Sequence, residues 1–392
     1  AMLWRTGPAP TELEEHVCDW LRQMIGLPDG YRGHINDTAS VSSLVSLAAA
    51  RERQLDLDIR RRGMAGRDDL PPLTIYCSDQ AHSSIDKAAI TLGVGLENLR
   101  RIETDDAFRM RIDKLEEAIA ADKAAGRRPI AIVATFGTTS TTSMDPLRKI
   151  GEICQRENIW FHVDGAYGGF AAVADGVDPA IRGLAEADSV AVDPHKWLYA
   201  PLEAGCALVR KVDHMRGAFS YHPPYYHFDK EVTNYFDLGP QNSRGFRALK
   251  VWLALKQVGR QGYKELIEQD NALAAYMYQL AGQHPELETA TCSLSIATFR
   301  FVPKDLADKT GEPTIAEYLN DLNQQLLERI EREGRIFVSK ALIDDSLYLR
   351  GCVCNFRTTR SDIEALPGIV VETGHAVDSD LRRNLQSKTL SD

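Results

Sequence analysis

The chain has 392 residues, of which 44% are apolar and 26% charged, as in ordinary globular proteins rather than disordered, collagen-like or membrane chains. Lysine and arginine number 46 against 56 aspartate and glutamate residues, which gives a net charge of −10 and disfavours nucleic acid or an anionic membrane as a partner. No apolar run approaches the roughly 20 residues that a membrane span needs. These counts favour an enzyme or a large binding protein with two or three folding units.

The number and spacing of the cysteines indicate in which cellular compartment the protein is found. Seven are present, scattered along the chain without the spacing of a metal site. Reduced thiols of this kind are typical of cytosolic proteins, and the first residues lack the apolar stretch of a signal peptide. We therefore expect a cytoplasmic protein that binds no metal ion.

Two helices are predicted at the start of the chain. The first has the capping box Thr11-Glu12-Leu13-Glu14 at its beginning, and Gly26-Leu27-Pro28 ends it. The second begins just after Thr38-Ala39-Ser40 and runs toward Arg51. Hydroxyls and free backbone N–H groups at such a helix start can bind an anion, although a plain helix cap is the commoner use of these residues.

Short apolar runs predict buried strands in the next part of the chain, at residues 73–77, 130–135, 159–163, 190–192 and 207–209. Helical stretches at 112–125 and 146–155 lie between some of these strands. Alternating strands and helices are typical of a mostly parallel sheet that is covered on both faces. This region is therefore expected to have an α/β fold.

The pattern changes near Asn271. Helices are predicted at 271–283 and 315–333, and strands at 295–302 and 347–355. A large domain over residues 1–270 and a smaller α+β domain over residues 271–392 explain this shift. Residues 222–245 have no clear periodicity, and loops of that length are usually functional.

Residues that can do chemistry follow the predicted strands. Ligands bind outside the carboxyl ends of the strands in open parallel sheets, so His82, Thr139, Asp164 and Lys196 are expected at one edge. A lysine there could simply reach into water. Paired with Asp164, it fits pyridoxal 5′-phosphate (PLP) better, because that cofactor needs a lysine for its aldehyde and a carboxylate for its ring nitrogen.

At these positions the sequence resembles the group II PLP-dependent decarboxylases, most closely the aromatic L-amino acid decarboxylases. The resemblance implies an α/β, aminotransferase-like fold of type I, with a mostly parallel seven-stranded sheet between helices and a smaller C-terminal α+β domain. It also implies a homodimer. The matching segments occur in family order and are Thr11-Glu12-Leu13-Glu14, Ser78-Asp79-Gln80-Ala81-His82-Ser83-Ser84, Ala134-Thr135-Phe136-Gly137-Thr138-Thr139, His162-Val163-Asp164-Gly165-Ala166-Tyr167 and Pro194-His195-Lys196-Trp197.

The resemblance also assigns roles to residues. It implies that Lys196 forms the Schiff base with the cofactor, that Asp164 pairs with the pyridine nitrogen, and that His82 stacks on the ring. Taken singly, His82 could be a core histidine and Thr139 a hydroxyl that bonds backbone. The other implied cofactor contacts are Ala39 and Ser40 at the phosphate, Thr139, Ala166 on the second ring face, His195, and Asp193, which stands where the family commonly has asparagine.

The long loop is similar to the family's catalytic loop. Its tyrosine, which is held to protonate the carbanion after carbon dioxide leaves, matches Tyr225, although the adjacent Tyr226 leaves the register open by one. A phenylalanine there is associated with oxidative aldehyde synthases. The tyrosine therefore favours plain decarboxylation, with Lys196, Asp164, His82 and Tyr225 as catalytic residues.

The expected reaction is PLP-dependent decarboxylation of an L-amino acid, most simply an aromatic one, to the amine and carbon dioxide. Alternatives are a non-aromatic substrate such as glutamate, sulfinoalanine or diaminobutyrate, oxidative aldehyde synthesis or transamination, and a scaffold without activity. Arg350 could bind a substrate carboxylate, but a surface ion pair is the simpler expectation. Relatives carry a further N-terminal stretch, whereas only ten residues precede Thr11 here, so dimerisation and the substrate pocket are expected to be affected.

Overall fold

A computed structural model describes residues 3–222 and 232–389 of the chain. Within it the chain forms two compact units, one of residues 1–139 and 143–264 and the other of residues 140–142 and 265–392. The boundary expected at residue 270 falls inside a helix that runs through both units, α9 (Arg247–Gln283), which is interrupted by non-helical backbone at Gly259. None of the described helices is both long enough and apolar enough to span a membrane.

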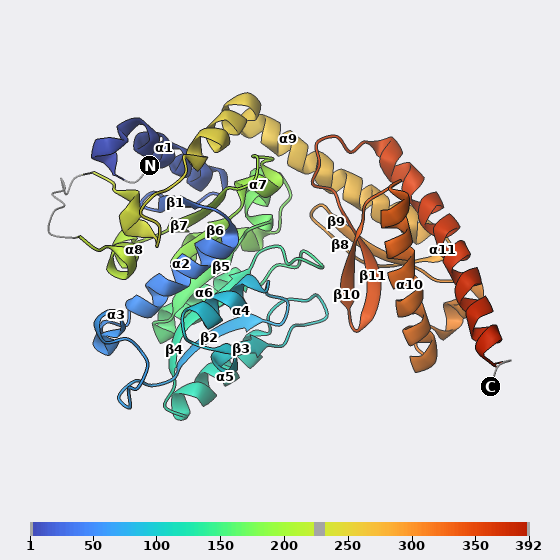
Figure 1. The fold of residues 1–392 in the computed structure, drawn as a ribbon, viewed down its shortest axis with the longest axis horizontal. Coiled ribbons are helices and arrows are strands. Elements are labelled where there is room, and N and C mark those ends of the chain that lie inside the picture. The colour runs from blue at the N-terminus through green and yellow to red at the C-terminus, as the bar shows by residue number, and fades with distance from the viewer. Residues whose placement is uncertain (1–2, 223–231, 390–392) are drawn as a thin grey trace. The chain divides into compact units, whose positions relative to one another are not determined.

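The larger unit is built on a seven-stranded sheet with the order β1-β7-β6-β5-β4-β2-β3 (Figure 1). Four pairings are parallel, namely β2 with β3, β2 with β4, β4 with β5, and β5 with β6, whereas β7 is antiparallel to both β6 and β1. The sheet is therefore mostly parallel, as predicted. The strands are β1 (Arg32–Asn36), β2 (Leu73–Ser78), β3 (Leu99–Ile102), β4 (Arg128–Thr135), β5 (Trp160–Asp164), β6 (Ser189–Val192) and β7 (Gly205–Val209).

Helices cover this sheet because its strands are apolar on both faces, with every residue of β2, β5, β6 and β7 buried. Helix α2 packs across β4 to β7 and against α4 and α8, while α5 and α6 pack against β4. The helices of this unit other than α9 are α1 (Pro8–Met24), α2 (Ala39–Glu52), α3 (Ile59–Arg62), α4 (Ser84–Thr91), α5 (Ile112–Ala124), α6 (Leu147–Glu157), α7 (Pro194–Trp197) and α8 (Val212–Phe219).

The smaller unit has the α+β character that its sequence predicted. Its four-stranded sheet has the antiparallel order β10-β11-β9-β8, and Phe299 and Phe301 of β9 lie in a core with side chains of α10 and α11. Its elements are the end of α9, β8 (Leu287–Ser293), β9 (Ile296–Phe301), α10 (Pro313–Glu333), β10 (Ser339–Ile343), β11 (Ser346–Cys352) and α11 (Arg360–Thr389).

The predicted capping box at the start of α1 is wrong. The helix begins three residues earlier at Pro8, whose fixed φ suits the first turn of a helix, and Thr11 donates its hydroxyl to the carbonyl of Gly7 at 2.9 Å. Glu14 is buried and accepts hydrogen bonds from the backbone N–H of Ile35 and from Arg244. Its carboxylate therefore holds the edge strand β1 instead of capping its own helix.

Candidate active site

Eight of the predicted site residues line one cavity at the carboxyl ends of β4, β5 and β6. Ser84, Thr135, Gly137 and Tyr167 complete the lining. The convergence follows from the parallel pairing, because neighbouring parallel strands end at the same edge of the sheet. The eight predicted residues are Ala39, Ser40, His82, Thr139, Asp164, Ala166, Asp193 and Lys196.

Asp164 is the last residue of β5 and is almost completely buried. One carboxylate oxygen accepts a hydrogen bond from the backbone N–H of Ala166 at 3.0 Å. The backbone N–H of Gly165 in turn donates to the carbonyl of Ala191 on the neighbouring strand β6. This turn fixes the direction of the carboxylate at the sheet edge.

Lys196 lies in the short helix α7, which follows β6. Its ammonium Nζ is 3.2 Å from Oδ2 of Asp193, and its side chain is 40% exposed, so the amine can reach the cavity. Asp193 is buried, and its other oxygen accepts a hydrogen bond from the backbone N–H of Ala39 at 2.7 Å. Burial raises the pKa of Asp193, while Lys196 and His195 act in the opposite direction.

His195, also predicted for the site, is not among the described residues that line the cavity, but it contacts Asp193, which is. The backbone N–H of Ala204 donates to Nδ1 of His195 at 3.0 Å, so in the neutral imidazole the proton is on Nε2, which is 3.6 Å from Oδ2 of Asp193. Burial lowers the pKa of His195, which favours this neutral form.

His82 lines the cavity and is exposed. Its Nδ1 accepts a hydrogen bond from the backbone N–H of Ser84 at 3.1 Å and lies 2.9 Å from the Ser84 hydroxyl. The neutral ring therefore carries its proton on Nε2. Ser84, which the sequence reasoning did not assign, thus orients the imidazole at the start of α4.

The first turn of α2 forms another wall. Ala39 and Ser40 are the first residues of this helix, where backbone N–H groups have no partner within the helix. Gly205 of β7 lets the helix start lie close to the sheet, because a Cβ atom at this glycine would be 2.2 Å from the carbonyl carbon of Thr38. The close approach brings an anion-binding helix end to the edge that carries Asp164 and Lys196.

Thr135, the last residue of β4, and Thr139, in the loop that follows, line the cavity. Asp145 holds this loop, since its buried carboxylate accepts hydrogen bonds from the backbone N–H groups of Thr135 and Met110, both at 2.7 Å. Burial raises the pKa of Asp145 to about 6. Sequence reasoning missed this residue, whose partners lie 10 and 35 positions away in the chain.

A buried hydrogen-bond network joins β5 to α2 behind the cavity. Trp160 Nε1 donates to the hydroxyl of Ser189 at 2.8 Å, Ser189 lies 2.8 Å from Nδ1 of His162, and Nε2 of His162 lies 3.0 Å from the hydroxyl of Ser43. Tryptophan can only donate, so the Ser189 hydroxyl accepts from Trp160, and both ring nitrogens of His162 lie within hydrogen-bond distance of a serine hydroxyl. Burial lowers the pKa of His162 to about 4.

The sequence also singled out Tyr225 and Arg350. Tyr225, with its neighbour Tyr226, lies outside the residues that the structure describes. Arg350 belongs to the smaller unit, where it lies on β11 and donates to the hydroxyl of Ser339 at 3.2 Å.

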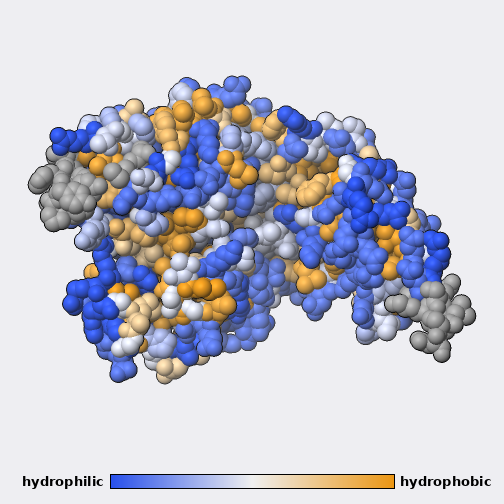
Figure 2. Space-filling model, in the orientation of Figure 1, coloured by the Kyte–Doolittle hydropathy of each residue, from blue (hydrophilic) through white to orange (hydrophobic). Residues whose placement is uncertain are grey.

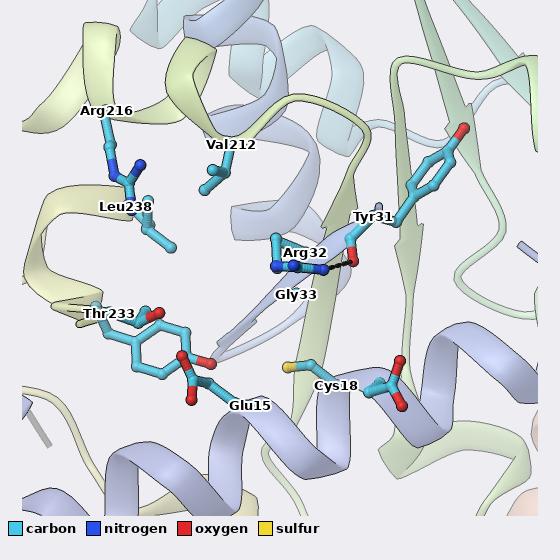
Figure 3. Close-up of a pocket in the computed structure, with 11 residues that line it drawn as sticks. Glu15, Cys18, Tyr31, Arg32, Gly33, Val212, Arg216, Thr233 and Leu238 are labelled. Carbon is cyan, nitrogen blue, oxygen red and sulfur yellow. Dashed lines mark hydrogen bonds between the residues drawn. The ribbon is translucent and has the colours of Figure 1, made fainter. Parts of the chain in front are cut away.

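A second cavity of about 300 Å³ lies elsewhere in the larger unit, between α1, β1 and α8 (Figure 3). Glu15 and Cys18 of α1 face Arg32 of the edge strand, which donates to the carbonyl of Tyr31 at 3.3 Å. Among its described lining residues there is neither a lysine nor a histidine. Burial also raises the pKa of Cys18, which makes it a poor nucleophile. The described lining of this second cavity therefore lacks the amine and the imidazole of the cavity with Lys196.

A family model described as the pyridoxal-dependent decarboxylase conserved domain matches residues 1–301. The chain belongs to the pyridoxal-dependent decarboxylase family. It is 31% identical over 366 residues to the aromatic-L-amino-acid decarboxylase of Bacillus atrophaeus, covering 92% of this chain and 72% of that protein.

Solved structures agree with this membership. The crystal structure of mouse CSAD superposes with a TM-score of 0.89 at 30% identity, covering 95% of this chain and 78% of that one. The structure of Oryza sativa TDC with PLP and tryptamine superposes with a TM-score of 0.87 at 29% identity, with the same coverage. The predicted type I fold is thereby confirmed, together with the PLP-dependent decarboxylase activity of the family.

The donor set of the cavity suits PLP. An amine, a buried carboxylate, an imidazole and the N-terminus of α2 are the groups that the cofactor's aldehyde, ring nitrogen, ring face and phosphate require. The hydroxyl of Thr135 is buried at the cavity and has no hydrogen-bond partner among the described residues. A bound polar ligand would provide one, as buried polar groups are usually paired.

Proposed function

We propose that this protein removes the carboxyl group of an aromatic L-amino acid, giving the amine and carbon dioxide. The observation that carries the proposal is the single cavity lined by Lys196, Asp164, His82 and the start of α2. The aromatic substrate is supported by the similarity to the aromatic-L-amino-acid decarboxylase and by the run Ser78-Asp79-Gln80-Ala81-His82-Ser83-Ser84.

In the proposed mechanism Lys196 supplies the amine that binds the cofactor's aldehyde, and Asp164 holds a proton at the ring nitrogen. The backbone N–H groups of Ala39 and Ser40 bind the phosphate. Bound PLP supplies an electron-accepting ring that stabilises the negative charge left on Cα when carbon dioxide departs.

Other residues of the chain orient the reacting groups. His82 would stack on one face of the ring and present Nε2–H, because the backbone N–H of Ser84 occupies Nδ1. Ala166 and Thr139 line the same cavity, where Ala166 would lie on the second face of the ring and Thr139 would contact the cofactor. The proton that Cα receives is assigned to Tyr225, or to a path through His82, and both assignments rest on the sequence.

The proposal is tested by measuring carbon dioxide and amine release from a panel of amino acids. Aromatic substrates are expected to react, and glutamate, sulfinoalanine and diaminobutyrate to remain unchanged. Replacing Lys196 by alanine should abolish turnover, whereas Lys87→Ala, at an exposed site of α4, should leave it intact. Turnover by Lys196→Ala would contradict the assignment, and hydrogen peroxide with ammonia among the products would indicate aldehyde synthesis instead.

We further propose that residues 1–270 hold the cofactor and that residues 271–392 form the small domain. Every described lining residue of the cavity precedes residue 197.

We also propose a cytoplasmic location. Four of the seven cysteines are buried and none is in a disulfide, which supports a reducing compartment.

A homodimer is also proposed. Figure 2 shows hydrophobic side chains gathered over the first part of α9. Phe246, just before this helix, is 38% exposed, and Leu249 and Leu253 within it are 40% and 53% exposed. Trp20 and Met24 of α1 line an adjacent cavity. A contiguous apolar patch of this kind marks a contact surface. Light scattering should give twice the chain mass, and Leu253→Glu should shift the protein toward the monomer.

A further inference from the structure

Asp193, the residue before Pro194, is an acid at the proposed cofactor site. Its two carboxylate oxygens make different contacts, and both affect how the cofactor would bind. One of its carboxylate oxygens is 2.7 Å from the backbone nitrogen of Ala39, the first residue of α2. The other oxygen is 3.2 Å from the ammonium of Lys196. Asp193 therefore binds both the helix end proposed for the phosphate and the lysine proposed for the aldehyde.

Charge makes these contacts consequential. A phosphate monoester carries about −1.5 to −2 charges at neutral pH. Asp193 is only 3% exposed, so its carboxylate is poorly screened by water. The carboxylate would repel the phosphate as a second anion at the same helix end, because like charges repel each other strongly where solvent is excluded.

The surrounding groups compensate this carboxylate only in part. Facing it are Lys196 and His195 of α7 and the backbone N–H of Ala39. His195 accepts a hydrogen bond at Nδ1 and its pKa is lowered by burial, so it is a neutral neighbour near pH 7. Asp164 and His82 line the same cavity, and Asp164 adds a further acid. Lys196 is thus the main cation beside Asp193.

We propose that Asp193 competes with the cofactor's phosphate for the N-terminus of α2 and thereby weakens cofactor binding in this chain. The inference rests on the proposed PLP site. In this role Asp193 is a positioning residue that holds Lys196 and Ala39 until the phosphate displaces its carboxylate. Asparagine has the same shape and lacks the charge, so Asp193→Asn removes the competition while keeping an oxygen for Ala39.

The test measures binding of pyridoxine 5′-phosphate, which has the ring and phosphate but no aldehyde for Lys196. Titration calorimetry compares the wild type with Asp193→Asn, and pyridoxine without phosphate serves as the control ligand. We expect Asp193→Asn to bind the phosphorylated ligand about tenfold or more tightly than the wild type, from the removal of one like charge at a poorly screened site. The affinity for pyridoxine should change little. A general effect of the substitution on the fold would instead change the affinity for both ligands.

A matched variant controls for net charge. Asp68→Asn alters an exposed acid and should leave both affinities unchanged. If Asp193→Asn does not fold, Asp193→Ser removes the same charge and retains a hydroxyl for the N–H of Ala39. Equal or weaker binding of pyridoxine 5′-phosphate by the neutral variant overturns the competition.

The outcomes separate this inference from the proposed function. Tight, phosphate-dependent binding by the wild type that is unaffected by Asp193→Asn leaves the cofactor site in place and rejects the role of Asp193 alone. If neither protein binds pyridoxine 5′-phosphate and PLP gives no covalent chromophore with the wild type, the cofactor site and the role of Asp193 are both rejected.

Discussion

Nε2 of His162 lies 3.0 Å from the hydroxyl of Ser43, and this contact joins the strand that ends in Asp164 to the helix that begins at Ala39. The two elements supply opposite ends of the proposed cofactor site, the ring-nitrogen acid and the phosphate-binding helix start. Because both side chains are completely buried, the contact helps to fix how far apart these groups lie.

The first prediction concerns pH. Burial lowers the pKa of His162 from 6.5 to about 4, so between these values the unfolded chain binds more protons at this site than the folded one. The stability that His162 contributes is therefore present above pH 6.5 and is lost as the pH falls toward 4, by about 3 kcal/mol over the whole range.

Replacing His162 by glutamine should flatten this dependence. Urea midpoints at pH 7, 6 and 5 are expected to fall more steeply in the wild type than in His162→Gln, although the variant starts from lower stability because it disrupts a buried network. His16→Gln, at an exposed position of α1, should retain the slope of the wild type. Identical slopes in the wild type and His162→Gln would contradict the assignment of a neutral buried imidazole.

The second prediction concerns the buried ion pair between Glu14 and Arg244, whose side chains are each only 1% exposed. Arg244 also donates to the carbonyl of Ile35 at 2.6 Å, so the pair covers the outer edge of β1. Glu14→Gln leaves the guanidinium buried without its counter-charge and should lower the free energy of unfolding by about 3 to 5 kcal/mol. Chemical denaturation measures this loss.

An exposed pair provides the comparison for Glu14. Nη2 of Arg111 is 2.5 Å from Oδ2 of Asp113, and the two side chains are 38% and 57% exposed. Water therefore screens their attraction. Asp113→Asn should therefore change stability little. A loss from Glu14→Gln as small as that from Asp113→Asn would show that the buried pair does not hold β1.

The third prediction concerns Gly205, where a Cβ atom would be 2.2 Å and 2.6 Å from backbone atoms of Thr38 and Ala39. Gly205→Ala should push the start of α2 away from β7 and destabilise the fold by about 1 to 3 kcal/mol. It should also weaken binding of PLP, because the phosphate-binding helix end moves. Gly217→Ala, in α8, meets no atom within 4 Å and should preserve both properties. Unchanged PLP affinity in Gly205→Ala would argue against the helix end as the phosphate site.

Much of the cofactor site could be predicted from the sequence, because chemistry-bearing residues at the carboxyl ends of parallel strands must meet. Asp164 and Lys196 were found in this way, from the apolar runs that precede them. The orienting partners were harder to find. Two of them had a local signal: His162 lies two positions before Asp164 and therefore on the same face of β5, and Ser84 lies two positions after His82.

Long-range partners explain the errors. Thr11 and Glu14 have the spacing of a capping box, but Arg244 is 230 positions from Glu14 and nothing local reveals their ion pair. The edge strand β1 was missed because Arg32–Asn36 contains arginine, glycine, histidine and asparagine and has no apolar run. Likewise, nothing in the sequence around Asp193 indicates that its carboxylate accepts a hydrogen bond from the backbone N–H of Ala39, 154 positions away.

Trapping the Schiff base proposed between Lys196 and the cofactor tests the cofactor site most directly. The PLP-loaded protein is reduced with borohydride, digested and analysed by mass spectrometry. We expect one phosphopyridoxyl group, on the peptide that contains Lys196, and none in Lys196→Ala. A label on another lysine, or no label on a protein that still releases carbon dioxide, would contradict this proposal.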